Sequence, residues 1–320
     1  MTAQRTKPCA WRACRAVLSA ASAVAVALAA ATAPAADAVG PGKVKIRPTH
    51  EAGRMLRYQL KVGGTTAWAP AAEGVDWGKL NTDFTFVLST KTLRENGACT
   101  YSLLGEHLRS IGEGPKGAFG IDATRRRTQI KIKDLWQVST DASPLTKPMT
   151  MTFGPLGGYR FGTGLLPLAP YMLEHVDPRF WTLLTIAPLK EVGPGDGWKE
   201  TFDVSLPGSK GKPLRLTGSW RVLGWQSWQG RRVLAMTLEA EWTIKDTSVV
   251  IENGDALHVA SGSYKAKGLA RWDVANGVLC HAAADQKVLI KVDKPKPAAM
   301  RSECDCSVQL LGLKKPPATK

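Results

Sequence analysis

The sequence is poor in cysteine and in the short motifs that mark common enzyme classes. Neither a Gly-x-Ser-x-Gly nor a His-Glu-x-x-His motif occurs in its 320 residues, which argues against hydrolases with a nucleophile elbow and zinc peptidases of that type. No residue pattern indicates a cofactor or a metal, so we predict neither. Only six cysteines are present, so the protein is not a small scaffold held together by disulfides.

Long apolar runs are also absent, except near the N-terminus. There a run rich in alanine and valine (16–33) is followed by Ala36-Asp37-Ala38. The basic residues before the run are Arg5, Lys7, Arg12 and Arg15. This order is typical of a signal peptide, so we predict a leader over residues 1–38 and an exported protein, in the periplasm, at the cell surface or secreted. No later stretch has the roughly 20 apolar residues of a membrane-spanning helix, so we predict none after cleavage.

Acidic residues are outnumbered by basic ones. The formal net charge is +16, and removal of the leader, with four basic residues and Asp37, leaves +13. Such a charge attracts anionic polymers and lipid headgroups. Nucleic acid carries the same charge, but export makes it the less expected partner. The charge does not indicate an oligomeric state.

What the sequence does contain is strand pattern. Residues 57–64 alternate apolar and polar side chains, as do residues 128–134, and such alternation predicts half-buried strands. Asn96-Gly97 separates the apolar runs 82–93 and 98–104, which is a strong signal for a β-hairpin. We therefore predict a mostly β fold.

The second half of the chain repeats the order of the first. The matched pairs are residues 58–62 with 202–206, the hairpin glycines Gly97 and Gly230, and the strand-opening Gly120 and Gly268. We predict two related, antiparallel, curved β-sheet halves, 39–150 and 198–320. A linker (151–197) with a short helical or irregular segment at 167–186 would join them. Coincidence among β-rich segments is the alternative to an internal duplication.

Two further motifs lie in the second half. Residues 195–198 read Gly-Asp-Gly-Trp, and Gly268, Ala270 and Asp273 form a Gly-x-Ala-x-x-Asp strand. With them, the chain resembles a group of exported bacterial proteins of unknown function that are built from two β halves. The resemblance implies the β architecture and no activity.

Residues 218–234 combine tryptophan with arginine. Even-numbered residues are apolar in both strands of this hairpin, and antiparallel pairing must place them on one face. The residue numbers of each opposed pair must therefore add to an even number, so Trp220 should face Met236 or Leu238. Trp225 and Trp228 fall where the alternation ends, in a loop expected at 224–230. Arg231 and Arg232 follow. These four residues form either a hairpin tip packed on its own sheet or a platform that stacks a sugar or base or inserts into a lipid interface.

A second candidate site is a basic patch with two alternative interpretations. It comprises Arg125, Arg126, Arg127, Lys131 and Lys133. It would bind an anionic polymer or lipid headgroups, and the alternative is an ordinary solvated face.

The four cysteines beyond the leader are Cys99, Cys280, Cys304 and Cys306. In an oxidising compartment they predict at least one disulfide that includes Cys304 or Cys306. Those two lie two positions apart on one strand face, which makes them poor partners for each other and better partners for Cys99 or Cys280.

We favour a non-catalytic envelope or extracellular protein that binds an anionic polymer or an amphipathic ligand. One alternative is a hydrolase of envelope polysaccharide whose carboxylates meet only in the fold, because such pairs need no fixed spacing. The other is a structural or assembly module that pairs through sheet edges.

Overall fold

The computed structural model describes twelve stretches of the chain. They are residues 42–70, 76–94, 98–114, 117–132, 135–138, 144–146, 148–154, 157–161, 190–204, 214–250, 256–294 and 297–314. The predicted leader, the predicted helical segment 167–186 and Lys133 lie outside these stretches. The chain divides into two units, Met1–Gly40 and Pro41–Lys320, and everything below concerns the second.

The described residues form strands and one short 3-10 helix. The first meander contains β1 (Met55–Pro70), β2 (Asp76–Leu93), β3 (Cys99–Gly114), β4 (Gly117–Thr124), β5 (Thr128–Ile132) and β6 (Leu135–Val138). The helix η1 (Pro144–Thr146), β7 (Met149–Gly154) and β8 (Gly157–Phe161) follow. The second meander contains β9 (Gly197–Val204), β10 (Leu214–Trp228), β11 (Arg231–Val250), β12 (Ala256–Asp273), β13 (Val278–Lys294) and β14 (Ala298–Lys314).

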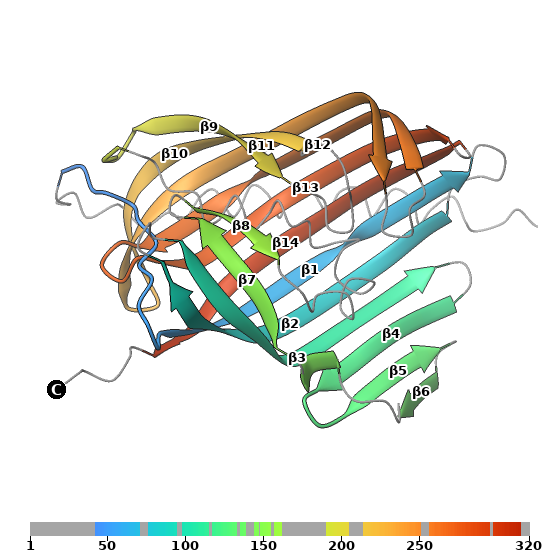
Figure 1. The fold of residues 1–320 in the computed structure, drawn as a ribbon, viewed down its shortest axis with the longest axis horizontal. Helices are drawn as coiled ribbons and strands as arrows, with labels where there is room; N and C mark the ends of the chain where they lie inside the picture. Colours follow the sequence, from blue (N-terminus) through green and yellow to red (C-terminus); the bar gives the residue numbers. More distant parts are fainter. Residues whose placement is uncertain are drawn as a thin grey trace, which may run out of the picture. The chain divides into compact units, whose positions relative to one another are not determined.

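All the strands belong to a single 14-stranded sheet, and their pairings are antiparallel (Figure 1). The order is β6-β5-β4-β3-β2-β1-β14-β13-β12-β11-β10-β9. β7 pairs with the first residues of β3 (99–103), which β4 does not reach, and β8 pairs with β7. The predicted mostly β fold is therefore confirmed. β1 pairs with β14, so the two meanders form one continuous sheet.

The two meanders run in the same direction along the sheet. The segments matched in the sequence occupy equivalent places: β1 and β9 are the first strands of their meanders, and β4 and β12 are the fourth. The hairpins β2–β3 and β10–β11 also correspond. This order is what a tandem duplication would produce, and the duplication itself stays a prediction.

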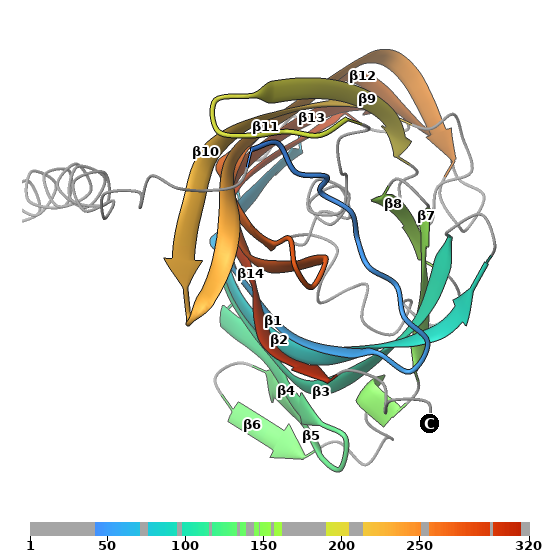
Figure 2. The same cartoon turned by 90° about the vertical axis from the view of Figure 1, so that its left-hand side faces the viewer.

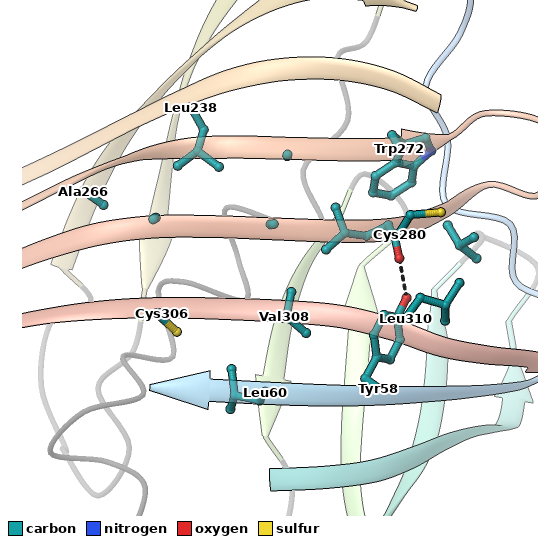
Figure 3. Close-up of a cluster of buried hydrophobic side chains, with 14 of the residues drawn as sticks. Tyr58, Leu60, Leu238, Ala266, Trp272, Cys280, Cys306, Val308 and Leu310 are labelled. Atoms are coloured by element: carbon teal, nitrogen blue, oxygen red, sulfur yellow. Dashed lines mark hydrogen bonds between the residues drawn. The ribbon is translucent and has the colours of Figure 1, made fainter. Parts of the chain in front are cut away.

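The sheet is curved (Figure 2), and one of its faces is apolar. Even-numbered residues of β1, β11, β12, β13 and β14 lie on this face because side chains alternate along a strand. They include Tyr58, Leu60, Leu238, Cys306 and Val308, which form part of one buried cluster (Figure 3). Odd-numbered neighbours such as Arg57 and Lys61 are exposed, so the sheet has one apolar and one polar face.

The hairpin β10–β11 has the predicted register at its base and differs from the prediction at its tip. Trp220 pairs with Leu238, as expected. The strands then continue to Trp228 and Arg231, where a loop was expected, and only residues 229–230 turn, with φ of 49° and 73°. Positive φ at both central residues is what a type I′ turn requires. A bulge at Leu223 adds one residue and shifts the register, which ends the alternation early without ending the strand.

An extended segment, residues 42–54, crosses one end of the sheet (Figure 2). Val44 forms a bridge with Val192, and the Thr49 amide donates to the Gly277 carbonyl at 3.0 Å. Buried Arg54 donates to the backbone carbonyls of Thr49 and Asn276. The segment thus ties the start of the second meander to the β12–β13 turn.

Candidate functional site

One row of paired residues across the apolar face consists of small side chains and one side-chain amide, that of Gln286. Strand pairing aligns Ala240 (β11), Ala266 (β12), Gln286 (β13), Cys304 (β14) and Gly64 (β1). Apart from Gln286, these residues have small side chains that project little from the sheet. They therefore form a low region that crosses five neighbouring strands.

The adjacent row is also low at its centre, where Gly268, Ala284 and Cys306 are aligned. A Cβ at Gly268 would lie 2.7 Å from the Cβ of Ala284, so only glycine fits where these strands approach. Larger side chains flank this low region. The Trp220 ring covers Gly218 and stacks on Trp198, with ring centroids 5.5 Å apart.

Gln286 places a polar group in this apolar surface. Its side chain is 1% exposed, and Oε1 accepts a hydrogen bond from the Tyr264 hydroxyl at 3.4 Å. Tyr264 is itself buried and stacks on Trp242, with ring centroids 6.2 Å apart, which orients the amide. Within the described residues, Nε2 has no hydrogen-bond partner. A buried donor without an acceptor costs roughly 1–3 kcal/mol, so the site favours an acceptor at this position.

Among the described elements, no second sheet or helical layer packs on the apolar face. Extensive contacts join only strands that are neighbours in the sheet, together with η1 on β3 and β4. The side chains of this face, such as Leu60, Leu238 and Val308, are nonetheless buried.

The polar groups at the other end of the core, near residues 42–54, have a structural role. His50 Nδ1 lies 2.8 Å from the Tyr101 hydroxyl, and burial, with Arg54 nearby, lowers the pKa of His50. Burial raises the pKa of Tyr58 and of Tyr101, and it raises the pKa of Cys280 to about 11. A thiol of that pKa is protonated at neutral pH and is a poor nucleophile.

The tryptophans predicted as a candidate site contact the protein's own arginines. The Arg232 guanidinium lies 4.5 Å from the centre of the Trp225 ring, and Arg231 donates to Asp273 at 3.2 Å. Trp228 packs against Arg271, whose guanidinium carbon lies 4.1 Å from the ring centre, and against His281, with ring centroids 5.0 Å apart. Arg271 and His281 contact each other at 3.0 Å.

Trp225 and Trp228 lie on opposite faces of β10, because they are three positions apart in regular strand beyond the bulge. They therefore do not form one platform. Arg271 and His281, which the sequence did not single out, are brought beside Trp228 by the pairing of β11, β12 and β13.

The predicted basic patch is partly assembled. The β4–β5 turn exposes Arg125, Arg126 and Arg127. The Thr124 hydroxyl closes the turn by accepting a hydrogen bond from the Arg127 amide at 3.2 Å. Lys131 is half-buried in β5. Lys133 belongs to the residues outside the described stretches.

The predicted disulfide is not formed. All four cysteines are buried, and no disulfide joins them. Cys306 lies opposite Ala284 and Val62, while Cys280 is four residues from Ala284 along β13, or about 13 Å. Cys99 lies three strands away from β14, or about 14 Å. Both separations exceed the roughly 7 Å between Cα atoms that a disulfide can bridge.

Within the described stretches, no three His, Cys, Asp or Glu side chains gather as a metal site would require. Nor do those stretches contain a helix long and apolar enough to span a membrane.

No protein-family model and no curated protein matches the chain. Among solved structures, it is similar to one that describes lipid–protein interactions in lipovitellin, at 11% identity and a TM-score of 0.41, over 85% of this chain and 26% of that one. The chain thus spans about a quarter of the lipovitellin chain. DynF from the dynemicin biosynthesis pathway of Micromonospora chersina has 9% identity and a TM-score of 0.21, over 89% and 92% of the two chains. OpdQ of Pseudomonas aeruginosa has 5% identity and a TM-score of 0.22, over 81% and 99%. Likeness of this degree says nothing of function, so the proposals below depend on the residues of this chain.

Proposed function

We propose that this is an exported, non-catalytic protein that binds an amphipathic ligand on the apolar face of its sheet. The observation that carries the proposal is the Gln286 amide, which is buried, oriented by Tyr264 and without an acceptor for Nε2 among the described residues. The amide lies in a row whose other side chains are small, with the Tyr264 side chain beside it.

The chemistry of the surroundings defines the ligand class. Leu238, Val62 and Val308 present aliphatic surface on both sides of the low region, and each buried methylene of a ligand contributes about 0.8 kcal/mol. Gln286 Nε2 can donate to a carbonyl or carboxyl oxygen. A molecule with an acyl chain and one such oxygen satisfies both features.

Organic extraction of the purified protein, followed by mass spectrometry, tests whether a lipid copurifies. After extraction and refolding, titration with dansyl-undecanoic acid measures the affinity. Ala266→Trp fills the row and should weaken binding at least about tenfold. Lys265→Trp, on the opposite, exposed face of the same strand, should leave binding unchanged.

Gln286→Leu removes the donor and should weaken binding about five- to tenfold, as expected for one hydrogen bond. Circular dichroism and thermal melting establish that each variant is folded. Equal affinity in all four folded proteins, or an extract without lipid together with no binding of the probe, would contradict the proposal.

A further inference from the structure

The exposed apolar side chains of the described residues are concentrated on one hairpin. Nine large hydrophobic side chains are exposed, and four of them lie within residues 132–138. Their exposed fractions are 51% for Ile132, 68% for Leu135, 39% for Trp136 and 60% for Val138. The other five are distributed over β1, β2, β10, β13 and β14. Single exposed hydrophobic residues are ordinary, whereas a cluster of this kind marks an interaction surface.

The four side chains project from both faces of the sheet edge. Among the described strands, β6 is the last of the sheet and pairs with β5 alone, where Ile132 faces Leu135 and Lys131 faces Trp136 (Figure 1). Trp136 and Val138 share one face, and Leu135 and Ile132 share the other, because side chains alternate along a strand. A flat protein partner would cover one face, whereas a hairpin with both faces apolar is suited to insertion into an apolar medium.

The same hairpin adjoins the exposed arginine turn. Arg125, Arg126 and Arg127 connect β4 to β5, and five residues of extended chain, about 16 Å, separate Arg127 from Ile132. Val138 pairs with Gln129 and so lies at the arginine end. Tryptophan is enriched at membrane interfaces, and arginine is drawn to anionic headgroups there.

We propose that the β5–β6 hairpin docks the protein on an anionic lipid surface. Ile132, Leu135, Trp136 and Val138 enter the boundary between headgroups and acyl chains, and the arginine turn contacts lipid phosphates. The main alternative occupant is a second copy of the chain paired along β6. A four-residue edge strand offers few backbone hydrogen bonds for such pairing, and the neighbouring positive charge would repel an identical copy.

Cosedimentation with vesicles tests the proposal, using phosphatidylcholine alone and phosphatidylcholine with phosphatidylglycerol. The wild-type protein should bind the anionic vesicles at least about tenfold more tightly. It should dissociate as salt approaches about 1 M, where the Debye length falls to about 3 Å. The double variant L135S/W136S should lose at least about tenfold in affinity for the anionic vesicles. The matched control is L223S/L289S, which removes two leucines that are each 49% exposed elsewhere on the sheet, and it should bind as the wild type does.

Replacing Arg125, Arg126 and Arg127 by Gln should reduce binding to anionic vesicles at least about tenfold and weaken its salt dependence. Replacing the exposed Lys265, Lys267 and Lys287 by Gln changes the net charge equally and should have a much smaller effect. Equal losses in hairpin and control variants would overturn the proposal, as would equal binding to both kinds of vesicle.

Analytical ultracentrifugation examines the alternative occupant. A wild-type dimer that L135S/W136S converts to a monomer would assign the hairpin to self-association and overturn membrane docking. The result is separable from the proposed ligand site, because A266W should abolish binding of the dansyl probe and leave vesicle binding intact.

Discussion

The hairpins β10–β11 and β5–β6 both carry tryptophan beside basic residues, yet they use them differently. In β10–β11, Trp225 and Trp228 are covered by Arg232, Arg271 and His281 of the same sheet. In β5–β6, Trp136 and its apolar neighbours remain exposed. The sequence is richer in tryptophan and arginine at the first hairpin, but the structure leaves the second one available to a partner.

The difference follows from position in the sheet. β11 lies between β10 and β12, so long side chains from β12 and β13 reach the tip of the β10–β11 hairpin. Among the described strands, β6 has one neighbour, β5, and none of the others covers it. A pattern rich in tryptophan and arginine therefore predicts a binding surface only where the fold leaves it without neighbours.

The largest expected difference between the hairpins concerns stability. Trp220→Ala should lower the free energy of unfolding by about 3–5 kcal/mol, because Trp220 is 4% exposed and stacks on Trp198. Trp136→Ala should change it by no more than about 0.5 kcal/mol, as for an ordinary surface site. Urea unfolding followed by circular dichroism measures both. Comparable losses of unfolding free energy in the two variants would mean that Trp136 is packed in solution, and the proposed difference between the two hairpins would be wrong.

A smaller effect should separate Trp228 from Trp136. Trp228→Ala removes the stacking on Arg271, and a double-mutant cycle with Arg271→Met should give a coupling of about 0.5–1 kcal/mol. The same cycle between Trp136 and Lys131, which face each other across β5 and β6, is the comparison and should give less. A coupling near zero for Trp228 and Arg271 would indicate that the arginine does not stack on the ring in solution.

The smallest expected effect is pH dependence. Burial, with Arg271 nearby, lowers the pKa of His281 in the folded protein. The unfolded chain therefore binds more protons as the pH falls below about 6.5, so acidification destabilises the fold. His281→Gln should reduce the loss of stability between pH 7 and pH 5 relative to the wild type, as measured by thermal unfolding. His50 has a lowered pKa for a related reason and serves as an independent second site. An unchanged pH profile in His281→Gln would show that this histidine is not held neutral by its surroundings.

Several local features could be predicted from residue order. The parity of apolar positions placed Trp220 opposite Met236 or Leu238, and Leu238 is its partner. The Asn96-Gly97 pair predicted the β2–β3 hairpin, in which Leu93 pairs with Cys99. Both inferences use the strict two-residue period of strands, which depends only on neighbours along one hairpin.

The candidate site could not be predicted in this way. Gln286 is one polar residue in a strand pattern, and only the pairing of β12, β13 and β14 shows that it stands among small side chains and under the Tyr264 hydroxyl. The predicted disulfide was wrong for the same reason. The number of cysteines in an oxidising compartment predicted a disulfide, whereas the strand register places Cys280 four residues from the position that faces Cys306.

β7 and β8 occupy part of the predicted linker 151–197, and the β10–β11 strands extend into a predicted loop, so residue order did not identify every strand. It did indicate the mostly β fold, the apolar face of strands such as β1 and β11, and the β2–β3 hairpin. These properties follow from side-chain alternation and turn chemistry over a few residues. The three-dimensional arrangement was needed to show that β1 pairs with β14, that the Leu223 bulge puts Trp225 and Trp228 on opposite faces, and that β6 is at an edge of the described sheet. The physical reason is that strand order and bulges are settled by contacts between residues far apart in the chain, which no local pattern records.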